Sequence, residues 1–195
     1  MAEAARSDTH PLDTMLAVST VIRNGRLARL YARVLECGTP TVDELADRVT
    51  SSKTTVYEDL NRLVDIGFLE GVTDGQPHRY RARNVEMTIQ ADEDSFEVTP
   101  TLLVALARRE TNKNLDLYAD RHGVSGLATA IEYARAYITS EMTARIMARE
   151  QDIPVLEAET VLQELAELLL EIEDDSSTSV DMEALDEAVD EQLNG

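Results

Sequence analysis

The stretch from Thr41 to Phe68, TVDELADRVTSSKTTVYEDLNRLVDIGF, constrains the fold of this chain more than any other segment. Its first half repeats apolar residues at the i, i+3, i+4 and i+7 positions of one helix face, at Val42, Leu45, Ala46 and Val49. Residues 50–52, Thr-Ser-Ser, then interrupt this pattern with side-chain oxygens that can cap a following helix. That second helix is predicted to bury Val56, Leu60 and Leu63. The segment therefore predicts two helices joined by a tight turn.

A basic hairpin follows the two helices. The sequence from Gly71 to Arg83 alternates around Asp74-Gly75, which is a strong signal for a β-hairpin. Because strand side chains alternate between faces, Tyr80 and Ala82 share one side of the second strand, and the other side carries Arg79, Arg81 and Arg83. Helix, turn, helix and basic hairpin together are the layout of a winged helix, which places one helix in the major groove of DNA.

The candidate DNA contacts lie on the polar face of the second helix and on the hairpin. The helix face offers hydrogen-bond donors, acceptors and one aromatic ring, from Ser52, Lys53, Thr54, Tyr57, Glu58, Asn61 and Arg62. Such a face suits base edges and phosphates, and Glu58 could accept a hydrogen bond from a cytosine amino group. The three wing arginines are predicted to hold the flanking backbone or minor groove, and His78 to meet a phosphate or solvent. The alternative interpretation is an ordinary helical hairpin beside a solvated charged strand.

Residues 26 to about 83 resemble the winged-helix domain of TrmB-like and related ArsR/MarR-type regulators of archaea and bacteria. The segment SSKTTVYEDLNRLVDIGFLE is similar to their recognition helix and wing entry, and QPHRYRA is similar to the wing return. The resemblance implies a DNA-binding transcription regulator that usually acts as a dimer. The larger sugar-sensing members carry a long C-terminal ligand domain, and this chain is too short to contain it in that form. Effector binding is therefore not carried over from this resemblance.

The charge of the chain is strongly negative and unevenly distributed. The formal net charge is −20, and Lys53 and Lys113 are the only lysines among 18 basic residues. Aromatic residues are also scarce, at 4%. This composition resembles that of proteins from extreme halophiles, in which surface carboxylates keep the protein hydrated while concentrated salt screens their mutual repulsion. An ordinary acidic mesophilic protein is the alternative. Residues 1–90 hold 11 basic and 13 acidic side chains, whereas residues 91–195 hold 7 and 25, so the expected DNA-reading half is nearly neutral.

The remaining segments predict further helices and a second hairpin, in a fold that is mainly α with small β (α+β). Helices are expected over Pro11–Asn24, over Arg26–Glu36 and from Thr99-Pro100 onward, and a hairpin is expected over Glu86–Thr99. A short helix should end at His122-Gly123. Ser125 should then cap a longer helix with an apolar seam that could face a partner, formed by Leu127, Ile131, Ala134, Ile138 and Met142.

The resulting domain prediction has five parts. They are an N-terminal helix (1–25), the winged helix (26–90), a hairpin with connecting helices (91–124), a helical dimerisation or partner domain (125–173) and an acidic tail (174–195).

The second half also contains a weak echo of the first. When the chain is shifted by 102 residues, the segments that begin YARVLECGTP and YARAYITSEM align without a gap, with seven identities in 33 positions. Proline at position 154 then stands where a second helix-turn-helix needs a helix start. Its reading helix would carry Glu157, Glu159, Glu164 and Glu167, which phosphates repel, so this unit is expected to be a degenerate trihelical unit reused for dimerisation or partner contact. Plain helices that pack on the first domain are the alternative.

The sequence offers no chemistry for catalysis. His10, His78 and His122 are too scattered for a metal site, and neither a phosphate loop, a GxSxG elbow nor a CxxC pair occurs. The single Cys37 excludes an internal disulfide and is expected to be a buried, inert thiol rather than a redox switch. No apolar run has the roughly 18 to 20 residues of a membrane span, and a signal peptide is absent, so a cytoplasmic protein is expected.

The function expected from the sequence is a sequence-specific transcription regulator that binds double-stranded DNA as a homodimer, without enzymatic activity, cofactor, metal or membrane partner. Whether a small-molecule effector gates it is left open. The alternative is a winged-helix adaptor that contacts the transcription machinery or another protein rather than DNA. The acidity of residues 91–195 favours this second hypothesis.

Overall fold

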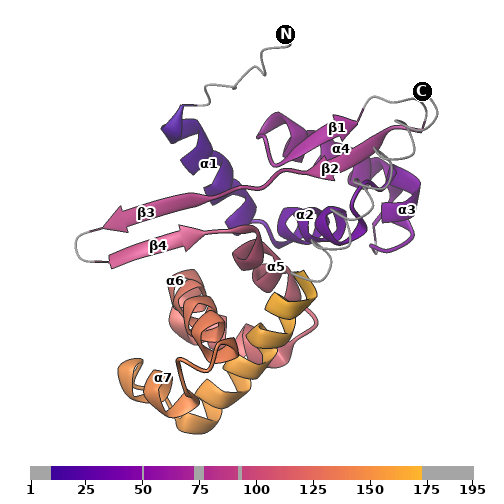
Figure 1. Cartoon of the computed structure of the whole chain (residues 1–195). Coiled ribbons are helices and arrows are strands. Elements are labelled where there is room, and N and C mark those ends of the chain that lie inside the picture. The colour runs from indigo at the N-terminus through magenta and orange to yellow at the C-terminus, as the bar shows by residue number, and fades with distance from the viewer. Residues whose placement is uncertain (1–9, 50, 73–76, 92–93, 173–195) are drawn as a thin grey trace, which may run out of the picture.

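The computed structural model describes residues 10–49, 51–72, 77–91 and 94–172 (Figure 1). The described helices are α1 (Pro11–Ile22), α2 (Gly25–Cys37), α3 (Val42–Ala46), α4 (Lys53–Asp65), α5 (Pro100–Arg108), α6 (Lys113–Ile138) and α7 (Ala144–Glu150). Residues 155–172 are helical as well. Two antiparallel hairpins complete the fold, β1 (Leu69–Val72) with β2 (Arg79–Ala82), and β3 (Met87–Ala91) with β4 (Asp94–Val98). The expected fold class, mainly α with small β, is confirmed.

Helix α2 is the central helix of the first unit. Asn24, expected to close α1, instead caps α2, because its side chain accepts a hydrogen bond from the backbone N–H of Leu27 at 3.4 Å. The helix therefore starts one residue before the predicted Arg26. Tyr31 is fully buried on α2, and its hydroxyl donates to the carbonyl of Arg83 at 2.9 Å. Its ring also meets Phe68 edge to face, with centroids 5.7 Å apart, so α2 holds both ends of the wing hairpin.

The wing hairpin is paired as the alternation of its residues predicts. Tyr80 is buried, whereas the side chains of Arg79, Arg81 and Arg83 are exposed. The expected Asp74-Gly75 turn lies outside the described residues. Strand β2 also pairs with the segment before α3, where the backbone N–H of Tyr80 donates to the carbonyl of Pro40 at 3.0 Å. This contact fixes the wing beside the start of the helix-turn-helix.

The predicted second hairpin is present, and β3 pairs with β4 from Met87 opposite Val98. The central part of its expected acidic tip, residues 92–93, lies outside the described residues. Thr99 then caps α5 by accepting from the backbone N–H of Leu102 at 3.4 Å, with Pro100 in the first turn as predicted. Residues 101–106 of α5 are all buried. Figure 1 shows α5 between α2 and the helices of the second half.

Helix α6 bends at Gly123, which has φ +72° and ψ −175°. The break expected at His122-Gly123 is therefore confirmed, but the helix resumes before Ser125, so this residue is not its cap. The expectation that the following apolar seam faces a partner is wrong for most of its length. Leu127, Ile131 and Ala134 are at most 2% exposed within the chain's own core, whereas Ile138 is exposed and Met142 is half-buried.

The second half contains three successive helices, the later part of α6, α7 and the helix of residues 155–172 (Figure 1). Two of the glutamates expected on a reading helix are bound inside the chain. Glu157 pairs with Arg121 at 3.1 Å, and Glu164 accepts from the side chains of Asn112 and Asn114. The buried apolar side chains of the described residues form a single cluster from α1 to the 155–172 helix. The acidic tail, residues 174–195, lies outside the described residues.

Candidate nucleic-acid interface

The helix-turn-helix begins with a complete capping box. The backbone N–H of Thr41 donates to the carboxylate of Glu44 at 2.8 Å, and the N–H of Glu44 donates to the Thr41 hydroxyl at 3.3 Å. The first of these bonds is the main reason that the pKa of Glu44 lies below its ordinary value. Ser52 caps α4 in turn by accepting from the N–H of Thr55 at 3.2 Å. Both helix starts are thus specified by local hydrogen bonds.

The inner face of α4 holds a charged anchor that the sequence analysis did not expect. Asp59 lies among the core-facing residues with its side chain 8% exposed, and Arg26 of α2 contacts both carboxylate oxygens, at 2.7 and 3.0 Å. This two-point contact opposes rotation of α4 about its own axis. It therefore helps to determine which side chains α4 presents to solvent.

The outer face of α4 presents the predicted set of polar side chains. Six of the seven residues are exposed, and Asn61 is half-buried. Lys53 forms an ion pair with Asp43 of α3 at 2.8 Å, and this hydrogen bond raises the pKa of Lys53. Arg62 follows Glu58 by one helical turn, so both lie on one flank of the face rather than at its centre near Tyr57. The face is solvated, with one lysine held by a carboxylate of the same chain.

The wing brings three arginines to one exposed strand face, as predicted. The side chains of Arg79, Arg81 and Arg83 are 46%, 50% and 50% exposed. Each also contacts a carboxylate of the chain. Glu70 on β1 lies 3.9 Å from Arg81 and 3.3 Å from Arg83, and Glu44 lies 3.8 Å from Arg79. Arg79 donates in addition to the carbonyl of Thr39 at 2.7 Å.

These ion pairs lower the positive potential of the wing without removing it. Three guanidinium groups face two carboxylates, and one of those, Glu44, already accepts the capping-box hydrogen bond. Pairs this exposed contribute roughly 0 to 1 kcal/mol each, so a phosphate can replace the carboxylate at little cost. The wing face therefore keeps a net positive charge and the donors needed to hold a phosphate.

A small aromatic cluster joins the wing to α4. His78 is exposed and meets the ring of Tyr80 edge to face, with centroids 5.6 Å apart. The hydroxyl of Tyr80 is buried and has no hydrogen-bond partner among the described residues. Burial raises the pKa of Tyr80, and the neighbouring Tyr57 adds to this effect. Tyr57, the centre of the α4 face, thus lies beside the base of the wing.

Comparison with protein families separates the chain into two matched segments. The family model described as "Sugar-specific transcriptional regulator TrmB" matches residues 28–86, which run from α2 to just before β3. This segment is TrmB-like. The match covers the helix-turn-helix and the wing, and it indicates that the chain is a transcription regulator. The resemblance drawn from the recognition-helix and wing residues is thereby confirmed.

The second match covers residues 109–174 and is to a family of unknown function (DUF7437). It begins at the end of α5, outside the TrmB-like domain. No curated protein and no solved structure matches the chain significantly.

Two further properties concern the described residues alone. None of their helices combines the length and apolar character needed to cross a membrane. Among the same residues, no group of three or more histidine, cysteine, aspartate or glutamate side chains is placed to hold a metal ion. Cys37 is half-buried, and burial raises the pKa of its thiol, so the expectation of a buried cysteine is only partly met.

The sequence analysis missed the arginines of α2. Arg26, Arg29 and Arg33 follow one another at i, i+3 and i+7, which places them on one stripe of the helix. This spacing is visible in the sequence, but the carboxylates that pair with Arg26 and Arg29 lie 33 residues away at Asp59 and 81 residues away at Glu110. Only the fold brings these carboxylates to the stripe.

Proposed function

We propose that this TrmB-like protein is a sequence-specific, DNA-binding transcription regulator that inserts α4 into the major groove. The observation that carries the proposal is the division of α4 into two faces. One face is buried and anchored through Asp59, while the opposite face is polar, solvated and next to an arginine-bearing strand. The polar face of such a helix can form hydrogen bonds with the base edges and phosphates that the major groove supplies.

Within this proposal the polar residues have different roles. Ser52, Lys53, Thr54, Tyr57, Glu58 and Asn61 meet bases or the groove edge, and Arg62 and His78 lie at its borders. Arg79, Arg81 and Arg83 hold phosphates or the adjacent minor groove. Base contacts distinguish sequences, whereas phosphate contacts contribute similarly to every sequence. The two groups therefore differ in what their loss does.

We also propose that the regulator acts as a homodimer joined along α1. Leu12, Met15 and Leu16 recur at i, i+3 and i+4 on this helix and are 54%, 53% and 56% exposed. The other side of α1 is already buried through Ala17, Val18 and Val21. A second copy would cover this apolar stripe. The α4 helices of the two copies could then bind two half-sites that lie about one turn of the DNA helix apart.

The composition supports adaptation to high salt, as in halophilic archaea. A net charge of −20 with two lysines suits a salt-loaded cell, where counterion release contributes little to DNA affinity. Affinity would then depend mainly on the hydrogen bonds and packing of the α4 face. DNA-binding tests of this protein therefore belong at high potassium concentration.

The test is selection of bound sequences from random DNA by the full chain at high potassium chloride, followed by affinity measurements on the selected site. Lys53→Ala combined with Tyr57→Ala should abolish the preference for the selected site over random DNA. Arg81→Ala should weaken the binding of the selected site and the binding of random DNA to a similar degree. Arg149→Ala is the matched control, because this exposed arginine lies on α7, outside the TrmB-like domain. Sedimentation of wild type and of Leu16→Ser measures whether α1 joins two copies.

Enrichment of a short palindrome, lost in the Lys53/Tyr57 variant, supports the proposal. If no sequence is enriched, or if the variant keeps the full preference, α4 is not the reading helix. If no sequence is enriched at all, the adaptor hypothesis, to which the family match lends no support, takes the place of the proposal.

A further inference from the structure

A cleft behind the reading helix gathers a large part of the positive charge of the chain. Its volume is about 240 Å³, and its wall is formed by α2, the turn before α4, the inner side of α4, and α5. Five arginines line it, together with three carboxylates, so the lining carries a net charge of +2 in a chain of −20. The arginines are Arg26, Arg29, Arg33, Arg48 and Arg108.

The cleft combines this charge with an apolar wall. Val49 and Ala107 line it and are half-buried, and the nearly buried Leu30, Val56 and Val104 lie behind them. Binding sites for small molecules commonly have such a combination, with an apolar surface for the body of the ligand and a few polar groups that fix its orientation. Here nearly all the strong donors are guanidinium groups, which bind phosphate and carboxylate through paired hydrogen bonds.

Arg48 is the member of this group that is available for a ligand. The other four contact carboxylates of the chain, Arg26 at Asp59, Arg29 at Glu110, Arg33 at Glu36 and Arg108 at Glu171. Among the described residues Arg48 has no carboxylate within ion-pair distance, and it donates a hydrogen bond to the sulfur of Cys37 at 3.2 Å. A thiol is a weak acceptor, so this guanidinium keeps most of its capacity for an anion.

The position of the cleft separates it from the proposed DNA contacts. The residues of α4 that line it are Val56 and Asp59, whereas Tyr57 and Asn61 belong to the exposed face. Successive residues of a helix are about 100° apart around its axis. The direction midway between Val56 and Asp59 therefore lies roughly 150° around α4 from the direction midway between Tyr57 and Asn61. DNA held by the outer face of α4 would therefore leave the cleft open.

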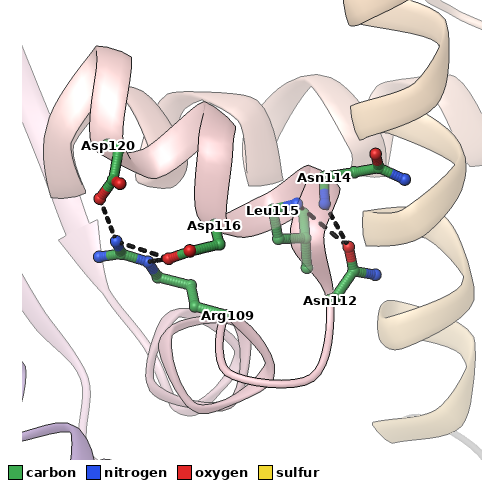
Figure 2. A network of polar contacts seen from close by, with 6 residues as sticks. All are labelled: Arg109, Asn112, Asn114, Leu115, Asp116 and Asp120. Carbon is green, nitrogen blue, oxygen red and sulfur yellow. Dashed lines mark hydrogen bonds and ion pairs between the residues drawn. The ribbon is translucent and has the colours of Figure 1, made fainter.

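The α5 wall of the cleft is held in place by contacts to the second half of the chain. Arg109, next to the cleft-lining Arg108, donates to Asp116 at 2.9 Å and to Asp120 at 2.6 Å on α6 (Figure 2). Asn112 caps the start of α6 by accepting from the backbone N–H groups of Asn114 and Leu115, as Figure 2 also shows. The wall is thus preformed, and it links the cleft to the segment that follows the TrmB-like domain.

We propose that this cleft binds a small organic anion, with its body against the apolar wall. Its phosphate or carboxylate group is held by Arg48 and also by Arg33, which exchanges its weak, exposed ion pair with Glu36 for the ligand. The site lies partly in the TrmB-like domain and partly on α5, which follows that domain. The ligand class is set by guanidinium donors and by a volume that suits a compact molecule. Binding requires no DNA, so the site is distinct from the α4 face and the wing.

The test is isothermal titration calorimetry of the full chain without DNA, at constant ionic strength set by potassium chloride. The probes are inorganic phosphate, phenyl phosphate and succinate, and phenol serves as the neutral control. Phenyl phosphate, succinate or both should bind, and phenol should not. Arg48→Ala should weaken the binding about tenfold or more, the usual loss when a charged hydrogen bond to an anion is removed. Arg149→Ala should bind like wild type. The relative affinities of phenyl phosphate and succinate decide whether phosphate or carboxylate is the preferred group.

Absence of saturable binding by all three anions overturns the proposal, and so does binding that Arg48→Ala leaves unchanged. Far-UV circular dichroism of Arg48→Ala checks that the variant is folded, which is expected because the side chain is exposed. If that variant were unfolded, Arg33→Ala provides the same comparison from α2. DNA selection is a separate measurement, so failure of the cleft proposal and failure of the DNA-binding proposal are distinguishable.

Discussion

Removing Arg26 should release the anchor of α4. In Arg26→Ala the Asp59 carboxylate would keep its buried position, with its side chain 8% exposed, and would lose both contacts of 2.7 and 3.0 Å. A buried carboxylate without a charged partner is unfavourable, because the interior does not replace its hydration. We therefore expect the variant to be less stable than the wild type and α4 to be less firmly oriented.

The size of the effect follows from the burial of the two partners. Removing one partner of a fully buried ion pair costs about 3 to 5 kcal/mol. Here the Arg26 side chain is 51% exposed, so water reaches one side of the pair and part of its attraction is already screened. We expect a loss of about 2 to 3 kcal/mol in the free energy of unfolding.

Urea denaturation followed by far-UV circular dichroism measures this loss. Arg62→Ala is the control. This exposed arginine of α4 forms no ion pair with another described residue, so its loss should change the stability by less than about 0.5 kcal/mol. The double variant Arg26→Ala with Asp59→Leu should recover most of the loss, because replacing both charges removes the stranded carboxylate. A single variant as stable as the control, or a double variant no better than the single, would refute the reasoning.

Two further predictions concern the kink of α6 and the capping box. Gly126→Ala should destabilise the chain by about 1 to 3 kcal/mol, because the added Cβ would lie 2.4 Å from the Cβ of His122; Gly25→Ala, with 3.6 Å to its nearest neighbour, is the control in the same thermal melts. Glu44→Gln should be less stable than wild type at neutral pH. The folded-state pKa of Glu44 is depressed below 4.5, so the stabilisation by its carboxylate is present above that pH and is lost as the pH falls through the folded pKa. Melts across this range should therefore show the two proteins converge in acid, and a constant difference would contradict the assigned cause.

The local elements of the first unit could be predicted from the sequence. The apolar spacing over 41–68, the Ser52 cap and the alternation over 79–83 each depend on neighbours within a few residues, and the structure has the helices, cap and strand faces in those places. Thr99-Pro100 and the break at Gly123 were predicted for the same reason. Caps, prolines and positive-φ glycines act through the adjacent backbone, so their effect is visible in sequence.

The seam of α6 shows where such reasoning fails. Leu127, Ile131 and Ala134 have the spacing of a buried face, and the sequence does not say whether the covering surface belongs to the same chain or to another. In the structure this surface is internal. The stripe on α1 at Leu12, Met15 and Leu16 has a similar spacing, yet it stays exposed.

The sequence by itself determined the helix-turn-helix, the wing and the division of α4 into an apolar and a polar face, because periodicity and capping are properties of consecutive residues. Only the tertiary structure decided which charges meet. Asp59 is paired with Arg26 across 33 residues, Glu70 and Glu44 moderate the wing arginines, and Arg48 is left without a carboxylate in the cleft. The strength of an ion pair depends on the distance between the two charges in space. Folding brings together charged groups that lie far apart in the sequence, and their separation along the chain does not predict that distance.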